Sequence, residues 1–319
     1  MVLCLAMNPA LVLGPRQGVT APPRRKCHPV ARISCGVICR NQNDGGRSRV
    51  GSSSDAAGDP RVTRVNKEDI VQGLRELGVR PGDHILVHSS LSRFGYVEGG
   101  AQTVIEALLA TVAPEGTVLV PTLTGKSTDG PDNPPAFDVR TTPCWTGRIP
   151  ETFRLRPEAL RSLHPTHSVA AIGALAQELT SGHEECYLPC GDGSPWVKLA
   201  RAGGKLVFFG VNLNCNTTFH AAEELAGVPY HMQSRISRCR MTDWNGRTFE
   251  RGYLLHQWGT PRRFEELEEA FLAMGLLRRG QIGAARVLVV DDGPMLEYTV
   301  DWLRRDPWAL VPPNSRPQR

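Results

Sequence analysis

The stretch from residue 206 to residue 230, LVFFGVNLNCNTTFHAAEELAGVPY, constrains the fold most, because it passes from an apolar run into a short polar helix. Residues 206–211 have the composition of a strand that is buried on both faces. The polar residues 212–216 break the apolar pattern, and their Asn and Thr side chains can cap a helix. Gly227 ends that helix, and Pro229 prevents it from resuming. The stretch therefore predicts one strand and one helix of an α/β fold.

The predicted helix carries three titratable side chains, His220, Glu223 and Glu224. His220 and Glu223 are three residues apart, a spacing that places both on one helix face within reach of each other. They follow the carboxyl end of a predicted core strand, which is where ligands bind in open α/β sheets. We therefore expect this helix to carry the candidate active site.

The charge of the chain is concentrated in its first 60 residues. That segment holds eight Lys or Arg and three Asp, which accounts for the whole formal net charge of +5. The rest of the chain is neutral and gives no indication of nucleic acid as a partner. No apolar run approaches the roughly 20 residues of a membrane span, so no membrane partner is expected either.

Residues 1–60 differ from the rest in composition, being rich in Arg, Gly, Ser and Pro with no acidic residue before Asp44. This composition suits a disordered extension, a start upstream of the native one, or an organelle transit peptide. The nine cysteines are irregularly spaced and do not form a disulfide framework, so we expect a cytoplasmic protein. We assign the folded domain to residues 61–305 and a frayed polar tail to residues 306–319.

Between these tails the sequence predicts alternating helices and strands, followed by a β-rich part. Asn-Gly at residues 245–246 marks the turn of a hairpin in that part. Helices are predicted at residues 67–77, 101–112, 147–160, 193–204, 264–277 and 297–305, and strands at residues 85–87, 118–120, 169–172, 234–241, 248–255 and 287–290.

Two loops of the domain are candidates for binding. The first follows the strand at residues 85–87 and contains HSSLSRFGYVEGG, a Gly/Ser loop before a helix that could cradle an anion. The second, residues 125–146, is long enough to be a binding loop and contains Asp129, Asp132 and Asp138. These carboxylates could attract a cationic substrate or could simply be solvated.

Several His and Cys residues are candidate metal ligands. His183, Glu185, Cys186 and Cys190 lie close in sequence, but C-x3-C without a second cysteine pair is not a zinc-ribbon pattern. No metal is therefore expected in the function.

The order of seven motifs resembles the aminoglycoside 3-N-acetyltransferase family over about residues 65–305. The joint order and spacing of the motifs carries the resemblance, since each motif alone is short. The motifs are LVHSSLSRFGYVEGG (86–100), LVPTLT (119–124), AFDVRTTPCWTGRIPETFR (136–154), HPTHSVAAIG (164–173), GSPWVKLARAGGKLVFFGV (193–211), NTTFHAAEELAGVPY (216–230) and GQIGAA (280–285).

This resemblance implies a three-layer α/β/α fold, distinct from the GNAT fold, and acetyl-CoA as cosubstrate. It implies catalysis by His220 of the H-x-x-E motif with Glu223 beside it, and it places His88 close to the reacting centre. It also implies contacts with coenzyme A by Ser89, Ser90, Leu91, Ser92, Arg93, Phe94, Thr122, His164 and Ser168.

The chemistry of such a transfer agrees with these residue types. An amine that is protonated at neutral pH needs a base that titrates near pH 7, and histidine is the natural choice. Glu223 could orient His220 and attract the amine, and Ser89–Leu91 backbone N–H groups or His88 could bind the oxyanion. The expected partner is a small-molecule amine. In the family this is a 2-deoxystreptamine aminoglycoside antibiotic, which is acetylated at its 3-amino group by direct transfer. The chain could also act as a homodimer. The acidic residues expected to bind it are Asp129, Asp132, Glu223 and Glu224.

Three alternatives stay open on the sequence. The sequence has one His before Ala-Ala-Glu and a loop at residues 125–146 that does not match the resistance enzymes, which favours a biosynthetic N-acyltransferase for another amine. A zinc-dependent hydrolase would use His164, His167, His220 and Glu223. A coenzyme A binder without activity would not need the titratable pair.

Overall fold

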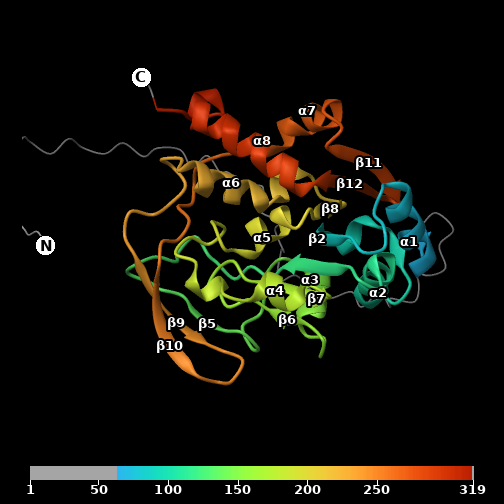
Figure 1. Ribbon diagram of the computed structural model, residues 1–319, viewed down its shortest axis with the longest axis horizontal. Coiled ribbons are helices and arrows are strands. Elements are labelled where there is room, and N and C mark those ends of the chain that lie inside the picture. The colour runs from blue at the N-terminus through green and yellow to red at the C-terminus, as the bar shows by residue number, and fades with distance from the viewer. Residues whose placement is uncertain (1–62, 318–319) are drawn as a thin grey trace, which may run out of the picture. The chain divides into compact units, whose positions relative to one another are not determined.

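Seven strands form one mixed sheet in the computed structural model, which describes residues 63–317; the segment 1–60 lies outside the described residues. The sheet order is β11-β12-β8-β2-β4-β7-β6, and Figure 1 shows it running through the middle of the domain. Strands β2, β4 and β8 are parallel, and the outer strands pair antiparallel. The strands are β2 (His84–Ser89), β4 (Thr117–Pro121), β6 (Leu160–Arg161), β7 (Val169–Gly173), β8 (Lys205–Phe209), β11 (Leu277–Ile282) and β12 (Ala285–Asp291).

The central strands are apolar on both faces because both faces are covered by helices. In β8, Leu206 and Phe208 pack into one hydrophobic core, and Val207 and Phe209 pack into the other. This pattern gives a continuous apolar run rather than an alternating one. The predicted core strand at residues 206–211 is therefore confirmed.

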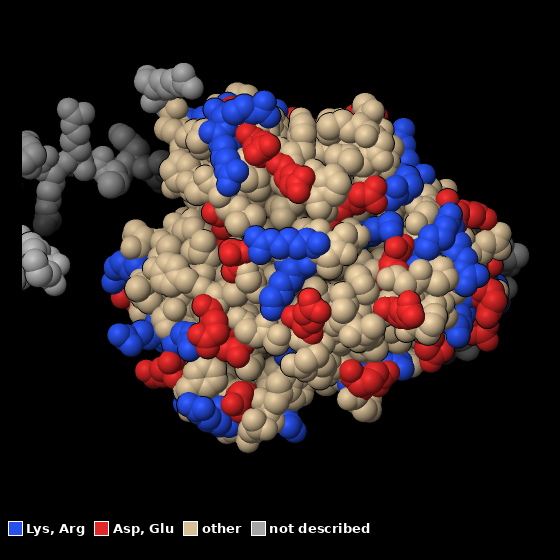
Figure 2. All heavy atoms as spheres, viewed as in Figure 1, with Lys and Arg blue, Asp and Glu red and all other residues tan. Residues whose placement is uncertain are grey.

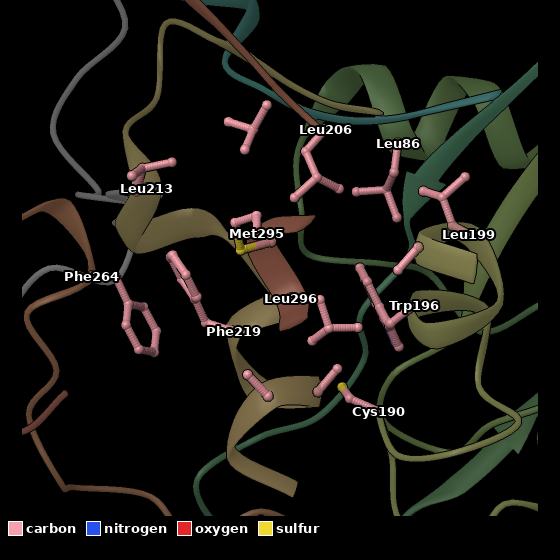
Figure 3. Close-up of a cluster of buried hydrophobic side chains, with 14 of the residues drawn as sticks. Leu86, Cys190, Trp196, Leu199, Leu206, Leu213, Phe219, Phe264, Met295 and Leu296 are labelled. Carbon is pink, nitrogen blue, oxygen red and sulfur yellow. The ribbon is translucent and has the colours of Figure 1, made fainter. Parts of the chain in front are cut away.

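Helices on the two faces complete a three-layer α/β/α domain, as expected. Helices α1 (Lys67–Glu76), α2 (Ala101–Val112) and α3 (Arg148–Arg154) supply apolar side chains to one core. The other core, part of which Figure 3 shows, contains side chains from five helices. These are α4 (Ala176–Thr180), α5 (Pro195–Arg201), α6 (Thr218–Ala226), α7 (Glu268–Ala273) and α8 (Asp292–Arg305).

Local sequence signals set the limits of several helices. Asn66 and Asp69 form a capping box at the start of α1, each side chain accepting a hydrogen bond of 2.9 Å from the other's backbone N–H. Gly227 ends α6 in the left-handed conformation, with φ 69°, which a residue with a Cβ rarely adopts. Both limits agree with the sequence prediction.

A second sheet joins the long loop to the hairpin. Strand β5 (Ala136–Asp138), inside the predicted loop 125–146, pairs parallel with β9 (Ser237–Thr242), and β9 pairs with β10 (Thr248–Tyr253). The third pairing, β1 (Arg64–Val65) with β3 (Tyr96–Val97), is short. The expected β-rich C-terminal part is thus divided, because β9 and β10 join the loop while β11 and β12 extend the central sheet.

Three sequence predictions need correction. The helix expected at 147–160 ends at Arg154, and strand β6 follows. The helix expected at 264–277 consists of a 3-10 turn and α7, and Gly275, with φ 72°, lies between it and β11. The residues before the strand expected at 287–290 were not predicted to be a strand, but they form β11, which is joined to β12 by a turn at Gly283 with φ 60° that the apolar pattern does not indicate.

The chain after α8 is packed, so the prediction of a frayed tail at 306–319 is wrong for its described part. Ala309, Leu310 and Val311 are fully buried in the core below α8. The backbone N–H of Arg263 donates to the Leu310 carbonyl at 3.0 Å. Polar and Pro residues around these three apolar ones obscured the signal.

From the sequence we expect neither a membrane span nor a strongly charged surface in the domain. Within residues 63–317, no helix has both the length and the apolar character needed to cross a bilayer. On the face shown in Figure 2, acidic and basic side chains are interspersed. This surface agrees with the near-neutral charge of the domain.

Candidate active site

The candidate site lies where two parallel strands, β2 and β8, end side by side. His88 is in register with Phe208, and Ser89 with Phe209. The loop after β2 packs tightly on the loop after β8, because a Cβ on Gly210 would approach the Arg93 Cβ to 2.2 Å. Gly210 also has φ 64°. The two predicted functional loops are therefore held together by the sheet.

Helix α6 is fixed in the apolar core by the residue that precedes the key histidine. Phe219 is fully buried, and its ring lies 4.7 Å from that of Phe264. Figure 3 shows Phe219 pointing into the core near Met295 of α8. Because successive helix residues point in different directions, the burial of Phe219 turns His220 toward the other side of α6.

His220 and Glu223 form a directly bonded pair, as the sequence predicts. The Nδ1 of His220 lies 2.8 Å from Oε2 of Glu223. The carboxylate is fully buried, whereas 28% of the imidazole is exposed. A proton on Nδ1 is held by the carboxylate, which leaves Nε2 of His220 with a lone pair. The pair can thus act as an oriented general base.

The other oxygen of Glu223 is held by a cation. Nε of Arg262 donates to Oε1 at 2.9 Å, and Nη2 of Arg262 lies 2.9 Å from Nδ1 of His231. Burial opposes ionisation of Glu223, but the neighbouring His231, His220 and Arg262 outweigh it and hold the pKa of the carboxyl well below its usual range. Glu223 is therefore an anion inside the protein.

Glu224, the next residue, faces a different environment. Its carboxyl accepts from the Cys190 backbone N–H at 3.0 and 3.1 Å and lies 2.6 Å from Nε2 of His256. Burial, with repulsion from Glu223, raises its pKa well above the usual range. The prediction that Glu224 contacts the acceptor needs correction, since the carboxyl is buried and points toward Cys190 and His256.

Three further imidazoles gather near the pair, those of His231, His256 and His167, and the first two were missed. The ring centroids of His220 and His231 are 4.9 Å apart, and those of His231 and His256 are 4.0 Å apart. His167 follows at 4.2 Å from His256. Burial lowers the pKa of His231 to about 3 and that of His167 and His256 well below their usual value.

Arg262 was missed as well, because its partner lies far from it in the sequence. Its partner Glu223 is 39 residues earlier in the chain. No motif spacing indicates such a pairing. A basic residue in an otherwise ordinary loop after the hairpin was the only signal.

His88 lies near the strand ends but outside this group of bonded residues. Its ring stacks on Phe208, with centroids 5.0 Å apart, and burial lowers its pKa to about 3. Nε2 of His88 is buried without a hydrogen-bond partner among the described residues. A neutral imidazole with an unpaired nitrogen is suited to bind a polar group of a ligand. The location of His88 beside the reacting centre stays a prediction.

The loop after β2 offers polar groups to a cosubstrate. The buried Ser89 hydroxyl has no partner among the described residues, and the Ser90 and Ser92 hydroxyls lie 3.3 Å apart. Residues Leu91–Arg93 form a 3-10 turn. These groups fit the predicted binding of coenzyme A, whereas the Phe94 side chain is fully buried against Phe209 and leaves only its backbone for such a contact.

The remaining predicted coenzyme A contacts are buried in a hydrogen-bonded network. Thr122 and Ser168 share a 2.9 Å hydrogen bond, and Nε of Arg161 donates to both. His164 is fully buried and accepts from the His167 N–H at 3.0 Å. These contacts support a role in positioning the loops, and direct contact with the cosubstrate stays a prediction.

The loop carboxylates already have partners, inside the loop for Asp129 and Asp138 and outside it for Asp132. Asp129 accepts from the Lys126 N–H at 2.7 Å, and Asp132 pairs with Arg235. Asp138 accepts from two backbone N–H groups of residues 140 and 141. To contact an acceptor as predicted, these carboxylates would therefore have to share or give up the partners they already have.

The metal candidates in the sequence are divided between different places. His183 bonds Ser162 at 2.9 Å and the Pro189 carbonyl at 2.8 Å. Of the predicted set, only Cys190 joins a group of possible ligand atoms, with His167 and His256. The set proposed for a hydrolase is not assembled either. Among the described residues, His167 groups with Cys190 and His256, His220 and Glu223 group with His231, and His164 joins no group of possible ligand atoms.

Comparisons with known proteins agree with this geometry. Residues 86–304 match the family described as aminoglycoside 3-N-acetyltransferase. Aminoglycoside N(3)-acetyltransferase III of a Salmonella species is 32% identical over 279 residues, which cover 79% of this chain and 97% of that protein. Aminoglycoside N(3)-acetyltransferase IX of Micromonospora chalcea is 30% identical over 75% of this chain and 93% of that protein.

Solved structures show the same similarity. AAC-IIIb, determined as a binary complex with CoASH, is 32% identical with a TM-score of 0.63, over 76% of this chain and 97% of that one. A histidine-to-alanine mutant of AAC(3)-IVa in complex with a gentamicin is 28% identical with a TM-score of 0.69, over 80% of this chain and 94% of that one.

Proposed function

The chain belongs to the aminoglycoside 3-N-acetyltransferase family, and we propose that it transfers an acetyl group from acetyl-CoA to the 3-amino group of an aminoglycoside with His220 as general base. Members of this family are acyltransferases that use acetyl-CoA. The observation that carries the proposal is the His220–Glu223 hydrogen bond of 2.8 Å, with Arg262 on the second carboxylate oxygen.

The proton transfer follows from the tautomer that this bond selects. With Nδ1–H of His220 donating to Glu223, the lone pair on Nε2 can take a proton from the acceptor amine. The buried anion then stabilises the imidazolium, because the opposite charges lie close together away from water. Acetyl-CoA, when bound, supplies an activated acetyl thioester, and the loop Ser89–Arg93 is the segment proposed to hold it.

Direct transfer is favoured over an acyl-enzyme. Cys190, whose backbone N–H bonds the Glu224 carboxyl, is fully buried, and burial raises the pKa of its thiol well above the usual value. Such a thiol carries little thiolate and is a poor nucleophile. His220 is the group with both exposure and an orienting partner.

A second acceptor class is favoured by the charges of the loop. Asp132 is neutralised by Arg235, and Asp129 lies in a small pocket together with Lys126, so this side of the site has no net acidic character. A smaller amine with one positive charge would suit this balance better than a polycation. The fold and the base would serve both acceptors.

A thiol-release assay with acetyl-CoA separates these acceptors. Gentamicin, sisomicin and simple amino sugars are compared as substrates of the purified full chain. Release with the two antibiotics supports the aminoglycoside acceptor, and release with the amino sugars alone supports the second class. No release with any amine, together with saturable binding of coenzyme A, would contradict both acceptor assignments.

A further inference from the structure

Next to the catalytic pair, buried side chains of the kinds that bind metals gather in one place. Each of Glu224, His231 and His256 offers one ligand atom, and these atoms all lie within 4.8 Å of one another. His167 and Cys190 form a second group of this kind with His256. Glu224, His231 and His256, each over 90% buried, are called the inner cluster below.

One nitrogen of the inner cluster is unpaired. Nε2 of His231 is buried without a hydrogen-bond partner in residues 63–317 and lies 3.8 Å from Oε1 of Glu224. A buried polar atom without a partner is uncommon and calls for an explanation. A cation between the imidazole and the carboxylate would satisfy it.

The distances suit a zinc-like ion. Zn–N and Zn–O bonds are about 2.0–2.2 Å long, so two ligands of a tetrahedral ion lie about 3.3 Å apart. The two distances to Oε1 of Glu224, 2.6 Å from His256 and 3.8 Å from His231, lie on either side of this value. Shifts of under about 1 Å would bring each of the two nitrogens to the spacing from Oε1 that ligands of one ion require.

The outer contacts are of the type that orients metal ligands. Nδ1 of His231 lies 3.2 Å from Oε2 of Glu223, so metal on Nε2 would place the Nδ1 proton toward a carboxylate. This tautomer requires Arg262 to give up its contact with Nδ1 while it keeps its bond to Glu223. Glu224 is held in place by the Cys190 N–H at 3.0 Å.

A route to the cluster exists. A narrow pocket lined by Lys126, Asp129, Thr166, His167 and Trp258 reaches His256. Trp258 is 37% exposed, so the pocket begins near the surface. Imidazole nitrogens, a carboxylate and a nearby thiol together suit zinc and its neighbours more than magnesium or calcium.

We propose that Glu224, His231 and His256 bind a zinc-class dication, and that the bound ion inhibits acetyl transfer. The inhibition follows from position, because His231 contacts Glu223 and stacks on His220. An ion on His231 draws the Glu223 carboxylate away from His220, which then loses the partner that orients it as a base. The inhibitory part rests on the proposed function, whereas metal binding does not.

Zinc binding is measured by calorimetry on the chelator-treated full chain. Cys4, Cys27, Cys35 and Cys39 are replaced by Ser in every variant, since thiols of the N-terminal segment would also bind zinc. We expect one zinc ion per chain and, with cobalt(II) as a probe, the visible absorption of a tetrahedral site.

Isosteric variants locate the site. Glu224→Gln keeps an oxygen for the Cys190 N–H, and it should weaken zinc binding at least about tenfold, as should His256→Gln. Cys186→Ser, which changes a buried thiol outside both groups, is the matched control and should bind as the parent does. Equal zinc affinity in the parent and in both ligand variants, or no zinc binding by the folded parent, would overturn the proposal.

The activity arm uses the thiol-release assay with zinc and then with excess chelator. Zinc should suppress turnover reversibly in the parent, and at least about tenfold more zinc should be needed in Glu224→Gln. Zinc binding without inhibition would overturn the inhibitory part. If the parent shows no transfer at all, the proposed function fails while the calorimetry still decides whether the site binds metal.

Discussion

Glu223 and Glu224, which are neighbours on α6, have the same side chain and similar burial, but they differ in their partners and in the direction of their pKa shifts. Glu223 is buried with Arg262 and two histidines, and its pKa is held well below the usual range. Glu224 is equally buried with a backbone N–H and a neutral histidine, and its pKa is raised. Burial is common to both, so the nearby cation and hydrogen bonds decide which residue is the anion.

The comparison shows why one residue suits catalysis and the other does not. An anion beside a partly exposed imidazole can hold the imidazolium that forms when an amine gives up its proton. A neutral carboxyl beside buried His256 stabilises no such charge. The following predictions test this division, from the largest expected effect to the smallest.

Replacing His220 removes the proposed general base. His220→Ala should lower kcat/KM by about 10²- to 10⁴-fold, because no other imidazole in residues 63–317 combines exposure with a bond to the ionised Glu223. Coenzyme A affinity, measured by calorimetry, should stay within about threefold. Turnover near that of the parent would show that the division between the glutamates is irrelevant to catalysis.

Replacing Glu223 keeps the base but removes the anion. Glu223→Gln should lower kcat on the order of 10²-fold, since the amide neither fixes the His220 tautomer nor stabilises the imidazolium. It should also reduce thermal stability, because Arg262 loses its buried partner. An unchanged kcat at every pH would mean that Glu223 only supports the fold.

Replacing Arg262 tests what keeps Glu223 ionised. Arg262→Gln should lower kcat/KM about tenfold near pH 6 and less at higher pH, because the pKa of Glu223 rises and the acid limb of the profile moves upward. Arg263→Gln is the matched control, since Arg263 contacts Glu266 and the Ala309 carbonyl instead. An unmoved acid limb in Arg262→Gln would exclude this cation as the cause.

The depressed pKa of Glu223 also makes the stability of the fold depend on pH. Because the folded pKa of Glu223 is depressed, its contribution to stability is present above the unfolded pKa of about 4.3 and is lost as pH falls toward the folded value. Arg262→Gln should therefore lower the free energy of unfolding most above about pH 5, and the difference from the parent should shrink as pH falls through the unfolded pKa. Denaturant unfolding from about pH 2 to about pH 7 measures this difference, and identical pH slopes in variant and parent would speak against it.

Asp292 extends the comparison to a carboxyl with no hydrogen-bond partner among the described residues. Burial raises its pKa well above the usual value. Its contribution to stability is therefore fully present below the unfolded pKa of about 3.9 and is lost as pH rises toward the folded pKa. Asp292→Asn should raise the free energy of unfolding by about 1 kcal/mol at pH 8 and remove this part of the pH slope.

Asp291→Asn is the neighbouring control. Asp291 pairs with Arg278 through both oxygens, at 2.8 and 3.2 Å, and is partly exposed. Its replacement should lower stability by about 0–1 kcal/mol. If Asp292→Asn destabilises as much as Asp291→Asn or more, Asp292 has a stabilising contact in solution.

Local signals made much of the fold predictable. The continuous apolar run of β8 and the Gly227 stop of α6 both act over a few residues, so the sequence shows them directly. The pairing of β5 with β9 joins residues about 100 positions apart, and no local pattern indicates it. The buried residues after α8 were missed because three apolar residues among prolines make no periodic pattern.

The site divides in the same way. His220 and Glu223 were predictable because their contact needs only the spacing of one helix turn. His231, His256 and Arg262 approach them through tertiary packing, and burial lowers the pKa of the two histidines. The two glutamates read alike in sequence, and only the side chains around them distinguish their roles.

The smallest effect should come from Glu224. At neutral pH its raised pKa keeps the carboxyl protonated, so Glu224→Gln changes neither charge nor shape appreciably and leaves an acceptor for the Cys190 N–H. With chelator present, kcat should fall at least about tenfold less than in Glu223→Gln, and the acid limb should not move. Equal losses in the two variants, measured in one pH series, would show that both glutamates act as anions and that the cation at Arg262 does not separate them.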